Sequence, residues 1–157
     1  MITIKLQDSL FAHEPSFCHS NNQINIKISR GPIEKGDIVV YTNNDCLNIN
    51  PNARKNIAFI CESYDLYKGC YEWIKANHEK FDLVLTWNKE LLEFNSQKFK
   101  LQLFGTTWIN EKFRQIYDKT KLCSIISSNK KITSGHKLRH AIIDKLINDQ
   151  NNIVDFY

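Results

Sequence analysis

Short apolar runs rich in Ile and Val recur along the chain and alternate with segments of helical spacing, which constrains the fold more than any other feature. Runs of this kind are typical of buried strands. They occupy residues 2–6, 24–29, 37–41, 57–61, 83–87, 100–104 and 122–127. Helical patterns cover 66–80, 89–94, 111–119 and the segment from 135 to 148. Strand–helix alternation predicts an α/β domain with a largely parallel sheet.

Local patterns also predict which residues are buried. Ser134 is the expected N-cap of the last helix, whose apolar face would consist of Leu138, Ala141, Ile142 and Leu146. The stretch 43–56 is polar and rich in turn residues, so we expect a surface loop there. Cys61 and Cys123 lie inside apolar runs and are expected to be small core residues.

Charge, hydropathy and cysteine usage exclude several classes of protein. The net charge is only +4, and no apolar run approaches the roughly 20 residues of a membrane span. The first residues lack a signal-peptide pattern, so we expect a cytoplasmic protein with no membrane span. The five cysteines form no C-x-x-C pair, which argues against a disulfide framework or a zinc ribbon. His136 and His140 are four residues apart, but no third ligand accompanies them, so no metal is expected.

The segment 119–140 carries six Lys or Arg residues and no acid. It reads as a strand, a polar loop and a helix start, and helix N-termini that follow strands bind anions in α/β folds. The loop offers Ser128, Asn129 and Lys130, and the first helical turns offer His136 and Arg139. These residues predict either a phosphate site or an ordinary polar connection. A nucleic-acid partner is not expected, because neither a basic helix nor an aromatic–basic stripe is present.

Glu62 directly follows the apolar run 57–61. A carboxylate at the carboxyl end of a central strand lies where α/β enzymes keep catalytic groups, and it could act as a general base. The alternative, a capping or salt-bridged acid at a strand exit, is the one that the sequence alone favours.

Four segments, taken in order, resemble the α-1,3/4-fucosyltransferase family, particularly its compact bacterial and viral-like members. The segment 57–64 looks like the acceptor-domain strand that ends in Glu-Ser, and 81–92 looks like the strand and helix that follow it. Residues 104–108 resemble a Tyr-Gly-type turn. Residues 124–157 resemble the donor-domain pattern of strand, Ser-Asn, spacer, Arg, helix and Val-Asp-x-Tyr. The resemblance begins near residue 55 and continues to the last residue.

This resemblance implies a GT-B type enzyme, with two Rossmann-like domains, that transfers fucose from GDP-fucose to a sugar acceptor with inversion. Glu62 would be the general base and Arg139 would hold the diphosphate. The donor loop would consist of Ser128, Asn129 and Lys130, with His136 beside it, and the acceptor side would include Tyr64 and Trp108. No metal or other cofactor is implied, because Arg and helix N–H groups can neutralise the leaving group.

The expected organisation is an acceptor domain at 1–118 and, at 119–157, the first strand and helix of a donor-binding domain. Family members continue beyond the point that matches Tyr157, so the resemblance implies a truncated gene product, a fragment, or a small relative whose cleft is completed by a second copy or a partner chain. The alternative functions are a noncatalytic remnant that binds a nucleotide or phosphosugar, or a role in binding a partner only.

Overall fold

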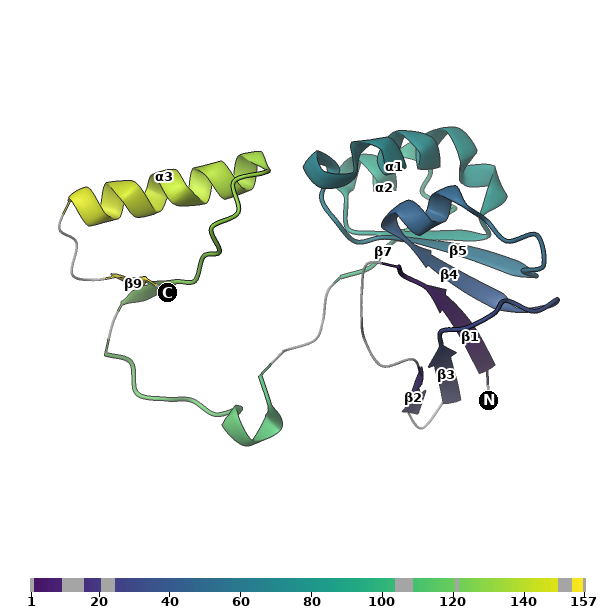
Figure 1. Cartoon of the computed structure of the whole chain (residues 1–157), viewed down its shortest axis with the longest axis horizontal. Helices are drawn as coiled ribbons and strands as arrows, with labels where there is room; N and C mark the ends of the chain where they lie inside the picture. The colour runs from purple at the N-terminus through teal and green to yellow at the C-terminus, as the bar shows by residue number, and fades with distance from the viewer. Residues whose placement is uncertain are drawn as a thin grey trace. The chain divides into compact units, whose positions relative to one another are not determined.

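A computed structural model describes residues 2–9, 16–20, 25–103, 109–120, 122–149 and 154–156, with the backbone alone for 16–20. The chain divides into two compact units, Met1–Phe104 and Gly105–Tyr157 (Figure 1). This division falls earlier in the chain than the boundary expected at residue 118. No helix among the described residues is both long and apolar enough to cross a membrane.

The first unit is built on a sheet of seven strands in the order β2-β3-β1-β4-β5-β6-β7. The strands are β1 (Ile2–Gln7), β2 (Ser16–Ser20), β3 (Asn25–Ser29), β4 (Ile38–Thr42), β5 (Lys55–Ile60), β6 (Leu83–Thr86) and β7 (Phe99–Leu101). Every neighbouring pair is parallel except β2 with β3. The predicted α/β class with a largely parallel sheet is therefore confirmed, and the arrangement is compatible with a Rossmann-like domain.

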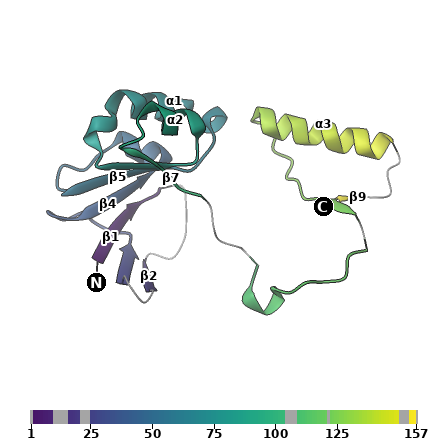
Figure 2. The ribbon, with the colours of Figure 1, turned by 180° about the vertical axis from the view of Figure 1, so that it is seen from behind.

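Two α-helices and two 3-10 turns connect the strands from β4 onward. They are η1 (Asn43–Leu47), α1 (Tyr64–Asn77), η2 (His78–Lys80) and α2 (Lys89–Phe94). Both views place α1 and α2 on the same side of the sheet (Figures 1 and 2). The core lies between these helices and the sheet, and its buried side chains include Val39, Tyr41, Ala58, Ile60, Tyr71, Ile74, Val84 and Leu91.

The opposite face of the same sheet is also apolar. Strand register aligns Ile4 with Ile38 and Val40 with Ile57, and these side chains are half-buried. Parallel sheets normally bury both faces, whereas the described helices of the first unit cover only one. The two faces of this sheet therefore differ in how deeply they bury similar side chains.

The second unit contains η3 (Glu111–Phe113), β8 (Cys123–Ile125), α3 (Ser134–Asn148) and β9 (Val154–Phe156), with β8 and β9 paired in parallel. The expected helix at 111–119 is wrong, because the chain forms only the short turn η3 and then runs without regular structure to β8. Ile116, which would have lain on its apolar stripe, is 97% exposed. Helical spacing over so few residues does not hold a helix without a surface to pack on.

Helix α3 forms where expected, but its cap and its inner face differ from the prediction. Thr133, and not Ser134, is the N-cap, and its hydroxyl accepts a hydrogen bond from the backbone N–H of His136. Leu138 and Ile142 of the predicted apolar face are 63% and 45% exposed. Ala141 is exposed as well, and of the predicted face only Leu146 is half-buried. The other half-buried side chains of α3 are His136, Arg139, His140 and Ile143.

Two further expectations about burial are wrong. The stretch 43–56 is not purely a surface loop, because Asn43 and Cys46 are fully buried in η1 and β5 begins at Lys55. Cys123 is exposed and Cys61 is half-buried, while Cys46 and Cys70 are buried. The turn at η1 places Cys46 against α1, a contact that the local sequence does not reveal.

Candidate active site

The candidate site lies where strand β5 ends. Residues 61–63 lead from β5 to α1, and the neighbouring strands β4 and β6 end at the same edge because all three are parallel. In open α/β sheets this edge is where ligands bind. The first residues after β4 and β6 are therefore in reach of the segment that carries Glu62.

The backbone of Cys61 and Glu62 is held by three side chains from three different elements. The backbone N–H groups of both residues donate to Oδ1 of Asn43, each at 3.1 Å. The indole Nε1 of Trp87 donates to the Cys61 carbonyl at 2.9 Å. The hydroxyl of Tyr71 donates to the Glu62 carbonyl at 2.6 Å. All four backbone polar groups of the two residues are thus satisfied by side chains, and we call this set of contacts the clamp.

The clamp residues come from the elements that surround β5. Asn43 follows β4, Trp87 follows β6, and Tyr71 lies on α1. Tyr71 is 1% exposed, and its ring meets that of Tyr64 edge-on at 5.4 Å between centroids. Burial raises the pKa of Tyr71 to about 12, so its hydroxyl stays protonated and remains a donor at neutral pH.

The clamp leaves the side chain of Glu62 unused. Glu62 is half-buried, and within the described part of the chain its carboxylate forms no hydrogen bond and no ion pair. It does not cap α1, because Ser63 is the N-cap and no side chain bonds to the helix end there. Neither structural role expected for an acid at a strand exit is seen, and the carboxylate is available to a ligand.

Two tyrosines, Tyr64 and Tyr67, lie in the first turn of α1, directly after Glu62 and Ser63. Tyr67 is half-buried and has non-helical backbone angles (φ −129°, ψ 37°), which interrupt α1 near its start. Burial first, and then the negative charge of Glu62, raise the pKa of Tyr67. Tyr64, predicted on the acceptor side, donates to Glu72 Oε1 at 3.0 Å, a hydrogen bond that raises the Tyr64 pKa. Trp108, the other predicted acceptor-side residue, lies outside the described residues.

A second polar cluster, which the sequence analysis missed, occupies the same edge beside β1. Arg30 donates through Nε and Nη2 to the two carboxylate oxygens of Asp8, both at 2.5 Å, and the Asp8 hydrogen bond raises the pKa of Arg30. Ser9 donates to Asp45 through its backbone N–H at 2.8 Å and its hydroxyl at 2.9 Å. The only sequence signal is that Asp8 follows an apolar run, as Glu62 does. Both anions are already paired, so this cluster fixes loops at the edge.

The predicted donor residues all belong to the second unit. Ser128, Asn129 and Lys130 are exposed in the loop between β8 and α3, and Arg139 is half-buried on α3. His136 Nδ1 accepts from the backbone N–H of Thr133 at 3.2 Å, which completes a capping box.

The loop and the helix are joined near these residues. A ring nitrogen of His140 lies 3.2 Å from the Lys130 carbonyl oxygen. The loop that carries the three predicted donor residues is thereby tied to the first two turns of α3, the part of the helix that carries Arg139.

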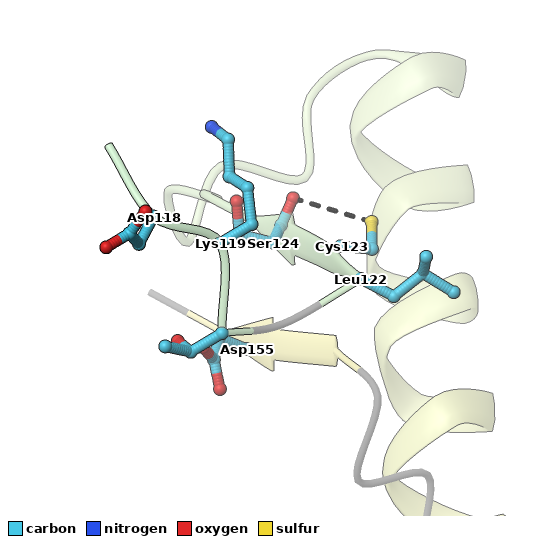
Figure 3. Close-up of a pocket in the computed structure, with 7 residues that line it drawn as sticks. Asp118, Lys119, Leu122, Cys123, Ser124 and Asp155 are labelled. Atoms are coloured by element: carbon cyan, nitrogen blue, oxygen red, sulfur yellow. Dashed lines mark hydrogen bonds between the residues drawn. The ribbon is translucent and has the colours of Figure 1, made fainter. Parts of the chain in front are cut away.

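An open hollow of about 560 Å³ lies beside the β8–β9 pair. It is lined by Asp118, Lys119, Thr120, Leu122, Cys123, Ser124 and Asp155, most of which Figure 3 labels. None of the predicted donor residues lines it. Within the described ranges, no three His, Cys, Asp or Glu side chains are grouped so that they could hold a metal ion.

Comparison with known proteins gives no relative for this chain: no protein-family model, no curated protein and no solved structure matches it.

Proposed function

We propose that this chain is a fucosyltransferase-like glycosyltransferase that moves fucose from GDP-fucose to a sugar acceptor with inversion. The observation that carries the proposal is the clamp around Cys61 and Glu62, which fixes the backbone and leaves the Glu62 carboxylate unengaged. Preorganised groups of this kind are the usual basis of general-base catalysis. The proposal also draws on the resemblance of residues 57–64 and 124–157 to the fucosyltransferase family.

The proposed reaction is a single displacement at the fucose anomeric carbon. The acceptor hydroxyl gives its proton to a carboxylate oxygen of Glu62 while its oxygen forms a bond to that carbon. The bond from the anomeric carbon to the diphosphate oxygen breaks at the same time, and GDP leaves with the electron pair. Attack opposite to the leaving group inverts the anomeric configuration, and Glu62 later returns its proton to solvent.

The diphosphate is assigned to the loop before α3. Arg139 offers a planar pair of donors that suits phosphate oxygens, and it is half-buried, so its side chain is partly preorganised. Lys130 adds positive charge, and Ser128 and Asn129 add hydrogen-bond donors from the exposed loop. His136 contributes through the capping box, which orders the start of α3 below Arg139.

Calorimetric titration of the full chain tests the donor half of this proposal. We expect GDP to bind more tightly than UDP, and we expect Arg139→Ala to weaken GDP binding strongly. Lys145→Ala, which removes a charge from the far end of the same helix, is the matched control and should bind GDP as the wild type does. Absence of binding at millimolar GDP would contradict the assignment.

Incubation of a printed glycan array with the chain and azide-tagged GDP-fucose tests the acceptor half. Labelled spots would identify the acceptor sugar. Binding of GDP with no labelled spot would favour the alternative function, a noncatalytic protein that binds a nucleotide or phosphosugar.

A further inference from the structure

Asn43 has an unusual backbone conformation for a residue that is fully buried. Its φ is 46°, and it is the only non-glycine residue with positive φ in the described part of the chain. This left-handed region costs an L-residue about 1 kcal/mol or more. Its side chain is 0% exposed. A strained, buried polar residue persists only where the surrounding contacts compensate for it.

The contacts of Asn43 are directed at the end of the neighbouring strand. Its Oδ1 accepts from the backbone N–H groups of Cys61 and Glu62, each at 3.1 Å. Its Nδ2 donates to Sγ of Cys61 at 3.2 Å, and its backbone carbonyl accepts from the thiol of Cys70 at 3.1 Å. Both ends of the side-chain amide therefore serve the segment 61–62.

This use of an asparagine differs from the local use seen elsewhere at the same sheet edge. After β6, the side chain of Asn88 accepts from the backbone N–H of Leu91 at 3.0 Å and caps the helix that follows it. Asparagine side chains usually bond in this way, to backbone a few residues along. Asn43 instead spans 18 and 19 residues of sequence to hold the two residues at the end of β5.

We infer that Asn43 is a positioning residue, which holds the segment 61–62 so that the Glu62 carboxylate points to the reacting hydroxyl. This inference rests on the proposed function, in which Glu62 is the base. The two N–H bonds fix the direction in which the Glu62 side chain leaves the backbone. A shift of about 1 Å in a reacting group lowers catalysis by about 100-fold, so loss of these bonds should act on the rate.

Three variants separate the side-chain contacts from the backbone strain. Asn43→Gly relieves the positive φ and removes the amide. Asn43→Asp keeps an oxygen acceptor for both N–H groups and removes only the Nδ2 donor to Cys61 Sγ. Asn43→Ser, whose hydroxyl is too short to reach the next strand, is a second removal variant should the glycine variant not fold.

The kinetic test uses GDP-fucose with the acceptor found on the glycan array. A removal variant should lower kcat by about 100-fold and leave the KM of the acceptor within about threefold, while Asn43→Asp should retain kcat within about tenfold. A folded removal variant with wild-type kcat would overturn the inference, and so would equal loss of kcat in Asn43→Asp and Asn43→Gly.

Amide hydrogen exchange of the ¹⁵N-labelled full chain gives a readout that needs no substrate. The amides of Cys61 and Glu62 should exchange at least about tenfold faster in Asn43→Gly and keep their protection in Asn43→Asp, with the amides of α2 unchanged in both. If the wild type transfers no fucose, the proposed function fails, and exchange alone then decides whether Asn43 holds Glu62. Unchanged protection at both amides, or a uniform loss that includes α2, would overturn the positioning role.

Discussion

Replacing Tyr71 by Phe tests the clamp through stability. The substitution removes the hydroxyl that donates to the Glu62 carbonyl at 2.6 Å and leaves the buried ring in place. A net hydrogen bond contributes about 1 kcal/mol, and a carbonyl left without its partner raises the loss to about 1–3 kcal/mol. Because the ring fills the same space, we expect a loss of about 2 kcal/mol in the free energy of unfolding, with no cavity contribution.

The same variant has a pH signature. The pKa of Tyr71 is raised from 10.0 to about 12 in the folded chain. Between pH 10 and 12 the folded state keeps the Tyr71 proton, which the unfolded state releases. The stability that this proton contributes is therefore fully present below pH 10 and is lost as the pH rises toward 12. Tyr71→Phe has no such proton and should lose less stability than the wild type between pH 10 and 12.

Urea unfolding followed by far-UV circular dichroism, at pH 7 and at steps above pH 9.5, measures both effects. Tyr64→Phe is the control, because the Tyr64 hydroxyl bonds to the exposed side chain of Glu72 and should contribute less than about 0.5 kcal/mol. Equal stability of Tyr71→Phe and the wild type at pH 7 would refute the reasoning that the clamp is a stable feature of the fold.

Three further predictions concern the two faces of the sheet, the Arg30–Asp8 pair at its edge, and the N-cap of helix α3. Ile60→Ala, at a fully buried position, should lose about 3–4 kcal/mol, whereas Ile57→Ala on the half-buried face of the same strand should lose about 1–2 kcal/mol; equal losses in urea would mean that both faces are covered. Arg30→Met leaves the Asp8 carboxylate, whose side chain is 5% exposed, without its partner. The variant should lose about 3–5 kcal/mol in the free energy of unfolding, and an added Asp8→Leu should restore most of that loss. Thr133→Ala removes the α3 cap and should weaken that helix by about 1 kcal/mol, seen as faster exchange of its first amides; unchanged exchange would contradict the capping role.

The sequence predicted the strands and helices whose signal is local. Strand β4 begins with Ile-Val-Val, β5 ends with Ile-Ala-Phe-Ile and β6 begins with Leu-Val-Leu, which are the apolar runs that buried parallel strands require. Helix α2 forms at the predicted residues, and Asn88 caps it by accepting from the backbone N–H of Leu91. Strand β2 was not predicted, since its sequence Ser-Phe-Cys-His-Ser is mostly polar, and it forms by antiparallel pairing with β3.

Helix α3 shows that the spacing of apolar residues does not by itself determine which face of a helix is buried. The predicted stripe assumed that the most apolar residues face inward, yet Leu138 is more than half exposed. The capping box sets where the helix begins, and the two short strands β8 and β9 offer little apolar surface to select a face. A helix with a small partner surface is oriented by its cap and polar contacts as much as by hydrophobic burial.

The site was predictable only in part. Glu62 could be found because it follows a central strand, but the residues that hold it lie 18 to 26 positions away along the chain or on the next helix. Their convergence depends on strand register, which fixes how far β4 and β6 extend past β5. Asn43 was assigned to a surface loop for the same reason, since only the register shows that its side chain reaches β5.

Transfer of labelled fucose from GDP-fucose to the array-identified acceptor, by the wild type and by Glu62→Gln, tests the central claim most directly. Glu93→Gln on the exposed face of α2 is the matched control. We predict transfer by the wild type and by the control, a loss of about 100- to 10,000-fold in Glu62→Gln, and unchanged GDP binding in all three. Wild-type rates in Glu62→Gln would contradict the assignment of Glu62 as the base.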